Sequence, residues 1–402
     1  MDVRGVRCRL RAGGADRAGD VPHPDRAARR SWRTGHCGHC HRDGAAVIRA
    51  GVIGCGNVAG NHASAYRDLP DTELVACADV DPARAGEFAA RYGAAATSPA
   101  EIFGLGLDVV SVCTPHPTHE AVVTEAAAHG VQVLCEKPIA IDLGAAARMI
   151  EACERAGVTL GVLFQRRFWP ASQRIRAAID DGTLGEPVLG HASVLLHRET
   201  SYYTADAWRG TWKTDGGGVL MTQAVHNIDL LQWFMGDAVE VHCSHTAFKH
   251  GDAIEVEDTA VATVRFASGG LATIAASTAL TPGLGTRVQV TGRTGATAGL
   301  AEYPEGSEAR LDVWAVPGQE AVASPFGAGL AEDLTLARIN GSLAPFHALQ
   351  IADFTAAVRE RREPAVTGRE AAKSLAILTA LYASAASGRP EAVPALGKEI
   401  TR

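Results

Sequence analysis

Residues 47–60 read VIRAGVIGCGNVAG, a short apolar run followed without a gap by a glycine-rich turn. This order predicts a strand, a tight turn at Gly54 and a helix that begins shortly after Gly56. Gly54 provides the turn, Gly56 allows the backbone to approach a pyrophosphate, and Ala59 is small enough for close packing of helix and strand. The helix N-terminus would then face the phosphates. The candidate cofactor-binding residues in this segment are Gly54, Gly56, Asn57 and Val58.

A second apolar run, residues 74–78, ends at Asp79. Its distance from the glycine turn is close to the spacing of about 20 residues expected for an acid that binds a ribose. A carboxylate at this position accepts hydrogen bonds from the ribose hydroxyls of NAD and repels the 2′-phosphate of NADP. The nearest following cation is Arg84, so we expect NAD and keep NADP as an alternative. Asp81 is better placed than Asp79 to cap the next helix.

Strands and helices keep alternating, with strands expected at 108–113 and 131–135 around a helix at 118–129. This alternation predicts a doubly wound parallel sheet, in which ligands bind at the carboxyl ends of strands. Two polar clusters follow these strands: TPHPTH at 114–119 and EKP at 136–138. Lysine is scarce in this chain, so a lysine at a strand end indicates a function. The candidates from these clusters are Thr114, Pro115, His119, Glu136 and Lys137.

Composition limits the class of protein. The 402 residues, 47% of them apolar, exceed what one hydrophobic core usually fills, so two domains are expected. The net charge of −7, without a basic block in the globular part, argues against a nucleic-acid partner. We find neither an apolar run of about 18 residues nor an apolar signal segment, and therefore expect a cytoplasmic protein without a membrane partner. The nine scattered cysteines imply no disulfide framework.

Residues 1–46 differ from the rest of the chain. They contain ten arginines, five aspartates, no lysine and no periodic apolar pattern. We expect this segment either to be disordered or to precede a native start near Val47. Residues 36–41, HCGHCH, have ligand types suited to zinc, but the second pair of a zinc finger is missing at the usual spacing. No metal site is therefore expected.

Taken in order, the glycine turn, Asp79, Thr114-Pro115 and the EKP cluster resemble the Gfo/Idh/MocA oxidoreductase family. The resemblance covers nearly everything after Val47 and continues in residues 161–168, 216–231 and 347–382. It implies an NAD(P)-binding Rossmann domain over 47–164 and a substrate-binding and oligomerisation domain over 165–402. The C-terminal helices would pack back towards the Rossmann domain.

The expected fold is therefore α/β: a doubly wound parallel sheet and a C-terminal α/β domain with an open, mainly antiparallel sheet. Family members commonly form homodimers or homotetramers through the outer face of that second sheet. The sequence agrees with such a sheet, because strand-like runs separated by turn residues occur at 239–247, 259–266, 271–277 and 287–291.

Oxidation of an alcohol requires a base at the hydroxyl and a cation for the developing alkoxide. The resemblance places Lys137 beside the hydroxyl and makes His226 the proton acceptor or relay. Many relatives carry an aspartate four residues before this histidine, where this chain has Thr222. The usual carboxylate is thus missing, and the relay would run through Lys137 or Asp229. The candidate substrate-binding residues are Arg167, Trp212, Thr222, Asn227 and Asp229.

Aromatic and basic residues gather at 202–213, just before the glycines at 216–218. Flat rings suit the C–H faces of sugars, and arginines such as Arg166, Arg167 and Arg209 suit carboxylate or phosphate groups; subunit packing is the alternative for each residue. We therefore expect an NAD(P)-dependent oxidoreductase that acts on a ring hydroxyl or ketone of a sugar, sugar derivative or cyclitol.

Three other functions stay open. One is cleavage or elimination of a glycoside with bound NAD as a redox catalyst. Another is a non-catalytic NAD(P) sensor, which the intact Lys137 disfavours. The last is a zinc-dependent nucleic-acid binder, which depends only on residues 1–46.

Overall fold

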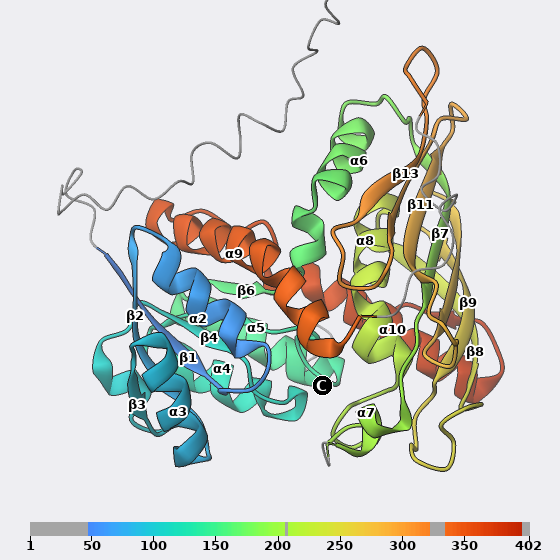
Figure 1. Ribbon diagram of the computed structural model, residues 1–402. Coiled ribbons are helices and arrows are strands. Elements are labelled where there is room, and N and C mark those ends of the chain that lie inside the picture. The colour runs from blue at the N-terminus through green and yellow to red at the C-terminus, as the bar shows by residue number, and fades with distance from the viewer. Residues whose placement is uncertain (1–46, 206–207, 322–333, 396–402) are drawn as a thin grey trace, which may run out of the picture. The chain divides into compact units, whose positions relative to one another are not determined.

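Two β-sheets organise the chain, one in the N-terminal and one in the C-terminal half (Figure 1). The computed structural model describes residues 47–205, 208–321 and 334–395, which belong to one unit of residues 46–402. The expectations for residues 1–46 lie outside the described residues. Among the described helices, none has both the length and the apolar character needed to cross a membrane.

The first sheet consists of six parallel strands in the order β3-β2-β1-β4-β5-β6. This order reverses between β1 and β4, as in the Rossmann fold, so ligands are expected at the carboxyl ends of these two strands. The parallel strands predicted from the apolar runs are confirmed, whereas the short, partly exposed strand β3 was not predicted. The strands are β1 (Ile48–Ile53), β2 (Thr72–Ala78), β3 (Ala95–Thr97), β4 (Val109–Val112), β5 (Gln132–Cys135) and β6 (Leu160–Val162).

Helices connect these strands, and their ends follow from local sequence. Asp81 caps α3 by accepting hydrogen bonds from the backbone N–H groups of Ala83 and Arg84, which confirms its predicted role. The helix after the glycine turn has no such side-chain cap; its N–H groups at Ala59 and Asn61 donate to the backbone oxygens of Gly56 and Val58 in the turn. The connecting helices are α2 (Ala59–Asp68), α3 (Pro82–Tyr92), α4 (His119–Ala128) and α5 (Leu143–Ala156).

The second sheet has eight strands in the order β13-β12-β11-β7-β10-β9-β8-β14. Only the β7–β10 pair is parallel, so the predicted mainly antiparallel sheet is confirmed. Four strands match the predicted runs: β8 (Ala238–Thr246), β9 (Thr259–Phe266), β10 (Leu271–Ser277) and β11 (Gly285–Gly292). The other four strands were not predicted: β7 (Pro187–Leu195), β12 (Thr297–Glu302), β13 (Arg310–Ala315) and β14 (Glu391–Ala392).

Burial alternates along the strands of the second sheet, so one face is covered and the other is open. The covering helices include α8 (Val225–Met235), which packs on β7 and β11, and α10 (Gly368–Ser387), which packs on β8. Helix α6 (Pro170–Asp180) packs on β12 and β13. A large hydrophobic core fills the space between these helices and the sheets.

Helix α9 (Leu336–Glu360) lies against α2 of the first sheet, as Figure 1 shows. The backbone oxygen of Asn340 accepts a hydrogen bond from the Asn61 amide at 3.2 Å. Further along the helix, the Gln350 amide donates to the backbone oxygen of Val162 at 2.7 Å. These contacts bring the C-terminal part of the chain to the edge of the nucleotide-binding turn.

Candidate active site

A cleft of about 820 Å³ lies at the carboxyl ends of the first sheet, with residues from the C-terminal half along its other wall. Most residues predicted for cofactor binding and catalysis, and one of the predicted substrate-binding residues, Thr222, line this cleft. They are Gly54, Gly56, Asn57, Val58, Asp79, Thr114, Pro115, Glu136, Lys137, Thr222 and His226.

The glycine turn has the geometry that a dinucleotide requires. Gly54 has a φ of +90°, and a Cβ there would lie 2.7 Å from the carbonyl group of Cys113. A Cβ on Gly56 would meet nothing within 4 Å, so its backbone borders open space in the cleft. Ala59 is fully buried beneath the helix, as its small size predicts. The residues present therefore fit a pyrophosphate at this turn.

Asp79 ends strand β2 and lines the cleft at 7% exposure. One carboxylate oxygen accepts a hydrogen bond from the backbone N–H of Cys55 at 2.8 Å, and the other accepts one from Asp81 at 2.9 Å. Arg84 also reaches this carboxylate, with Nη1 3.2 Å from Oδ1. The backbone bonds fix the carboxylate next to the glycine turn, where an adenosine ribose is expected.

Lys137 follows strand β5, and its ammonium group crosses the cleft to the C-terminal half. Its Nζ donates a hydrogen bond to the backbone oxygen of Thr222 at 3.2 Å. Burial lowers the pKa of Lys137, and the guanidinium groups of Arg166 and Arg209 lower it further. The negative charge of Glu136 raises it, but the net shift is downward. A lysine with a lowered pKa is suited to exchange protons near neutral pH.

His226 lies in the first turn of α8, directly after a π-helical turn (Leu220–Ala224). It is 6% exposed, and its buried Nδ1 has no hydrogen-bond partner among the described residues. Burial and the positive charge of Lys137 hold its pKa well below the usual value, so the ring is neutral. A neutral imidazole beside the lysine is suited to accept a proton.

The glycines before the π-helical turn hold these residues in place. A Cβ on Gly218 would lie 1.7 Å from the backbone oxygen of Glu257, so only glycine fits. The Glu257 carboxylate accepts hydrogen bonds from the backbone N–H groups of Gly218 at 3.0 Å and Leu220 at 2.9 Å. Glu257 thus fixes the backbone that carries Thr222 and His226.

Comparison with known proteins agrees with this geometry. Residues 48–164 match the model of an oxidoreductase family with an NAD-binding Rossmann fold, and residues 172–298 match the GFO/IDH/MocA C-terminal domain. The chain belongs to the Gfo/Idh/MocA oxidoreductase family.

Relatives within the Gfo/Idh/MocA family span nearly the whole chain. D-apiose dehydrogenase of Paraburkholderia graminis is 30% identical over 88% of this chain and 91% of that protein. Inositol 2-dehydrogenase of Rhizobium meliloti is 28% identical over 85% of this chain and 98% of that protein. The WlbA dehydrogenase from Bordetella pertussis, crystallised with NADH and UDP-GlcNAcA, superimposes with a TM-score of 0.76 at 30% identity, covering 87% of this chain and 99% of that structure.

The glutamate of the EKP cluster is a buried anion in this Gfo/Idh/MocA protein. Its Oε1 lies 3.1 Å from Nε2 of His62 and 3.6 Å from Nε2 of His347. Burial alone would raise the pKa of Glu136, but hydrogen bonds to these histidines hold it well below the usual value. The other nitrogen of each ring bonds elsewhere, to Ser111 and to the backbone oxygen of Leu343. The cluster therefore ties α2 and α9 to the strand end that carries Lys137.

Five of the predicted site residues do not line this cleft: His119, Arg167, Trp212, Asn227 and Asp229. His119 is fully buried and bonds to the backbone oxygens of Thr114, Pro138 and Ile139, so it joins two loops behind the cleft. Trp212 packs edge-on against Tyr382 at 5.2 Å.

The other displaced residues form buried polar pairs inside the C-terminal half. Arg167 makes two hydrogen bonds of 2.7 Å to the Asp229 carboxylate, and the side chains are 3% and 1% exposed. Asn227 accepts a hydrogen bond from Arg166 at 2.7 Å. Asn227 and Asp229 follow His226 on α8, but the sequence could not show which face of the helix each occupies.

Several cleft residues were missing from the predicted site. Arg198 and Glu305 form an ion pair of 2.6 Å in the cleft wall, and His347 and Leu343 enter from α9. Arg198 lies 60 residues after the EKP cluster, and Glu305 and Leu343 lie more than 160 residues after it, so the spacing of the N-terminal motifs did not indicate them. His347 begins the 347–382 segment, but that segment did not by itself place the residue in the site. His116 lies within the TPHPTH cluster and lines the cleft, but it was not among the predicted site residues.

Proposed function

We propose that this protein is an NAD-dependent dehydrogenase that oxidises a ring hydroxyl of a sugar, sugar derivative or cyclitol, or reduces the corresponding ketone. The observation that carries the proposal is the convergence of Lys137 and His226 in the cleft that begins at the glycine turn and Asp79. Its relatives named for apiose and inositol support the substrate class.

The cleft residues have separate roles in cofactor binding and in proton transfer. The turn at Gly54 and Gly56 would receive the pyrophosphate, and the Asp79 carboxylate would receive ribose hydroxyls and disfavour a 2′-phosphate. Bound NAD⁺ supplies the hydride acceptor. Lys137, with its lowered pKa, takes the hydroxyl proton, and the neutral ring of His226 accepts or relays it.

Aromatic and polar side chains of the C-terminal half are suited to hold a polyol. Trp208 and Tyr202 line the cleft beside Thr222. Arg209 lies over both rings and donates a hydrogen bond to the Tyr202 hydroxyl at 2.6 Å. Apolar ring faces and hydroxyl-bonding groups together match the alternating C–H and O–H surface of a sugar.

The open face of the second sheet supports assembly into a homodimer or homotetramer. Leu189 and Leu271 are neighbours on adjacent strands, and each is more than half exposed. Val261 on the next strand is 56% exposed. Exposed apolar residues on the open face of a sheet support a subunit interface there. Light scattering of the purified protein tests this proposal: a monomer at micromolar concentration would contradict it.

The function itself is tested by NADH and NADPH formation across cyclitols, free sugars, uronates and nucleotide sugars. We expect NADH formation with at least one compound and a preference for NAD⁺ over NADP⁺. Absence of turnover together with cofactor that stays bound through purification would favour redox-assisted glycoside cleavage. Absence of turnover with reversible NAD binding would favour a sensor.

A further inference from the structure

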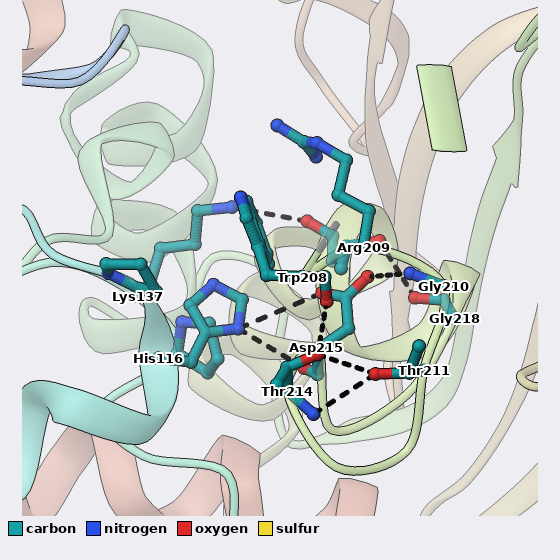
Figure 2. Close-up of polar contacts among 12 residues, drawn as sticks. His116, Lys137, Trp208, Arg209, Gly210, Thr211, Thr214, Asp215 and Gly218 are labelled. Atoms are coloured by element: carbon teal, nitrogen blue, oxygen red, sulfur yellow. Dashed lines mark hydrogen bonds and ion pairs between the residues drawn. The ribbon is translucent and has the colours of Figure 1, made fainter. Parts of the chain in front are cut away.

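His116 is a cleft residue that the mechanism above does not use. It follows strand β4 and lies between the two halves of the chain, close to Lys137 (Figure 2). Its Nδ1 is 3.2 Å from the backbone oxygen of Asp215 and 4.0 Å from the Asp215 carboxylate. The ring packs edge-on against Trp208, with centroids 5.4 Å apart. These contacts fix both the position and the rotation of the ring.

The partners of His116 also fix its tautomer. Backbone and carboxylate oxygens only accept hydrogen bonds, so Nδ1 carries the hydrogen and donates it to Asp215. Burial, together with the neighbouring His119 ring and the positive charge of Lys137, lowers the pKa of His116 to about 3, so the ring is neutral. Nε2 of a neutral ring with hydrogen on Nδ1 is an acceptor. No described residue bonds to Nε2 of His116, and the side chain lines the cleft.

Asp215 is a buried carboxylate next to His116. The residue is 2% exposed, and one carboxylate oxygen accepts a hydrogen bond from the backbone N–H of Gly210 at 3.0 Å. The other oxygen, Oδ1, is buried without a hydrogen-bond partner among the described residues. It is the oxygen nearest to His116. A buried carboxylate with a free oxygen has a high cost unless it serves a neighbouring group.

The charge of Asp215 acts on the catalytic lysine as well. Burial raises the pKa of Asp215 to about 6, so the carboxylate is ionised at neutral pH and above. There it favours the protonated form of Lys137, in the opposite direction to burial. Thr222, whose backbone oxygen accepts a hydrogen bond from Lys137, has no charge. Asp215 provides a negative charge near the same lysine from the segment before the glycines.

We propose that His116 is a substrate-binding residue, with Nε2 accepting a hydrogen bond from a hydroxyl of the substrate beside Lys137. Asp215 is its positioning residue: it fixes the tautomer of His116 and supplies the buried negative charge that Thr222 lacks. This inference is based on the proposed dehydrogenase function. The substrate is favoured over the cofactor as the hydroxyl donor because Trp208 and Asp215, which hold the ring, belong to the substrate-binding half.

Two substitutions of His116 test the roles of its two ring nitrogens separately. The amide of His116→Asn reaches about as far as Nδ1 and keeps the bond to Asp215, whereas His116→Gln places an oxygen near the position of Nε2. We expect kcat/KM for the substrate to fall about 10- to 100-fold in His116→Asn and to recover in part in His116→Gln. The KM for NAD⁺ should stay unchanged in both, and thermal unfolding should confirm that both variants fold.

A second measurement is the pH dependence of the fall in kcat/KM that His116→Asn causes. The ratio of wild-type to His116→Asn kcat/KM should be constant from about pH 7 to 9. The reason is that the neutral His116 ring acts as a hydrogen-bond acceptor and does not change its protonation state over this range. Equal kcat/KM in the two proteins would overturn the proposal. A higher KM for NAD⁺ with an unchanged substrate KM would also overturn it, because the hydroxyl would then belong to the cofactor.

Asp215→Asn tests the charge of Asp215, because the backbone oxygen that accepts from His116 Nδ1 is the same in this variant. The charged and titratable groups around Lys137 are Glu136, Arg166, Arg209, Asp215, His116 and His226, and Arg209, Lys137 and Glu257 face Asp215. Removing the Asp215 charge lowers the pKa of Lys137, so the acid limb of the kcat/KM profile should move to lower pH, with a lower plateau. An unmoved limb with unchanged kcat/KM would show that Asp215 is only structural. Wild-type turnover, run beside the variants, tests the dehydrogenase function separately.

Discussion

Asp229→Asn distinguishes a buried structural pair from a substrate contact. Asp229 accepts two hydrogen bonds of 2.7 Å from Arg167 and one of 3.1 Å from Ser374. Burial alone would lower the pKa of Arg167, but the carboxylates of Asp229 and Glu370 outweigh burial and raise it. Arg167 is therefore charged, and the asparagine variant leaves this buried guanidinium with weaker compensation.

The loss in unfolding free energy that we expect for Asp229→Asn depends on the groups that remain around Arg167. Loss of one partner of a buried ion pair costs about 3–5 kcal/mol. The Glu370 carboxylate, 3.5 Å from Nη1, is still present, and the Trp233 ring lies 5.2 Å from the guanidinium carbon. We therefore expect the lower end of the range, about 3 kcal/mol, or a fall in Tm of about 6 °C.

Thermal unfolding and steady-state kinetics together test this expectation. The control is Asp180→Asn, which removes the partner of Arg176 at a site where Asp180 is 63% exposed and should cost less than about 1 kcal/mol. We expect Asp229→Asn to lower Tm well below the control while the KM for the substrate stays near wild type. An unchanged Tm with a strongly raised KM would refute the structural assignment and restore a direct substrate contact.

Three further predictions concern the cofactor and the base. Because the pKa of Lys137 is lowered and the neutral amine is the base, kcat/KM for oxidation should rise with pH along a limb whose midpoint lies below 10.5; a midpoint at or above this value would exclude Lys137. Asp79→Asn removes one acceptor and the charge, so calorimetry should show NAD⁺ binding weakened about 10-fold and the preference over NADP⁺ reduced; unchanged affinities would contradict the ribose role. Gly54→Ala places a Cβ 2.7 Å from the Cys113 carbonyl, so it should lower Tm and weaken NAD⁺ binding, whereas Gly86→Ala, in open space on α3, should do neither.

The sequence predicted the parts of the fold in which local pattern and burial agree. Strands β1, β2, β4 and β5 are short apolar runs that end at turn or polar residues, and their order along the chain implies a parallel sheet. Strand β7 was missed although it is central in the second sheet, because its outward residues, such as His191 and Ser193, interrupt the apolar pattern. Its strand character depends on neighbours that are distant in sequence.

Dependence on residues distant in the sequence also explains which site residues could be predicted and which could not. Residues directly after strands, such as Asp79 and Lys137, could be placed because the carboxyl ends of parallel strands share one edge. Side chains on α8 could not, because His226 and Asp229 belong to one helix, yet only His226 lines the cleft. The role of Asp215 depends on a contact with His116 across the two halves of the chain, which no local pattern encodes.

The most direct test of the central claim is NADH formation by the wild type and by Lys137→Ala, at saturating NAD⁺, with the best compound from the substrate panel. Removal of a proton-transfer group at the reacting hydroxyl should lower kcat by about 100-fold or more, with NAD⁺ affinity and Tm retained. A Lys137→Ala variant that forms NADH at the wild-type rate would contradict the account, because hydride transfer would then not depend on the residue around which the cleft is built.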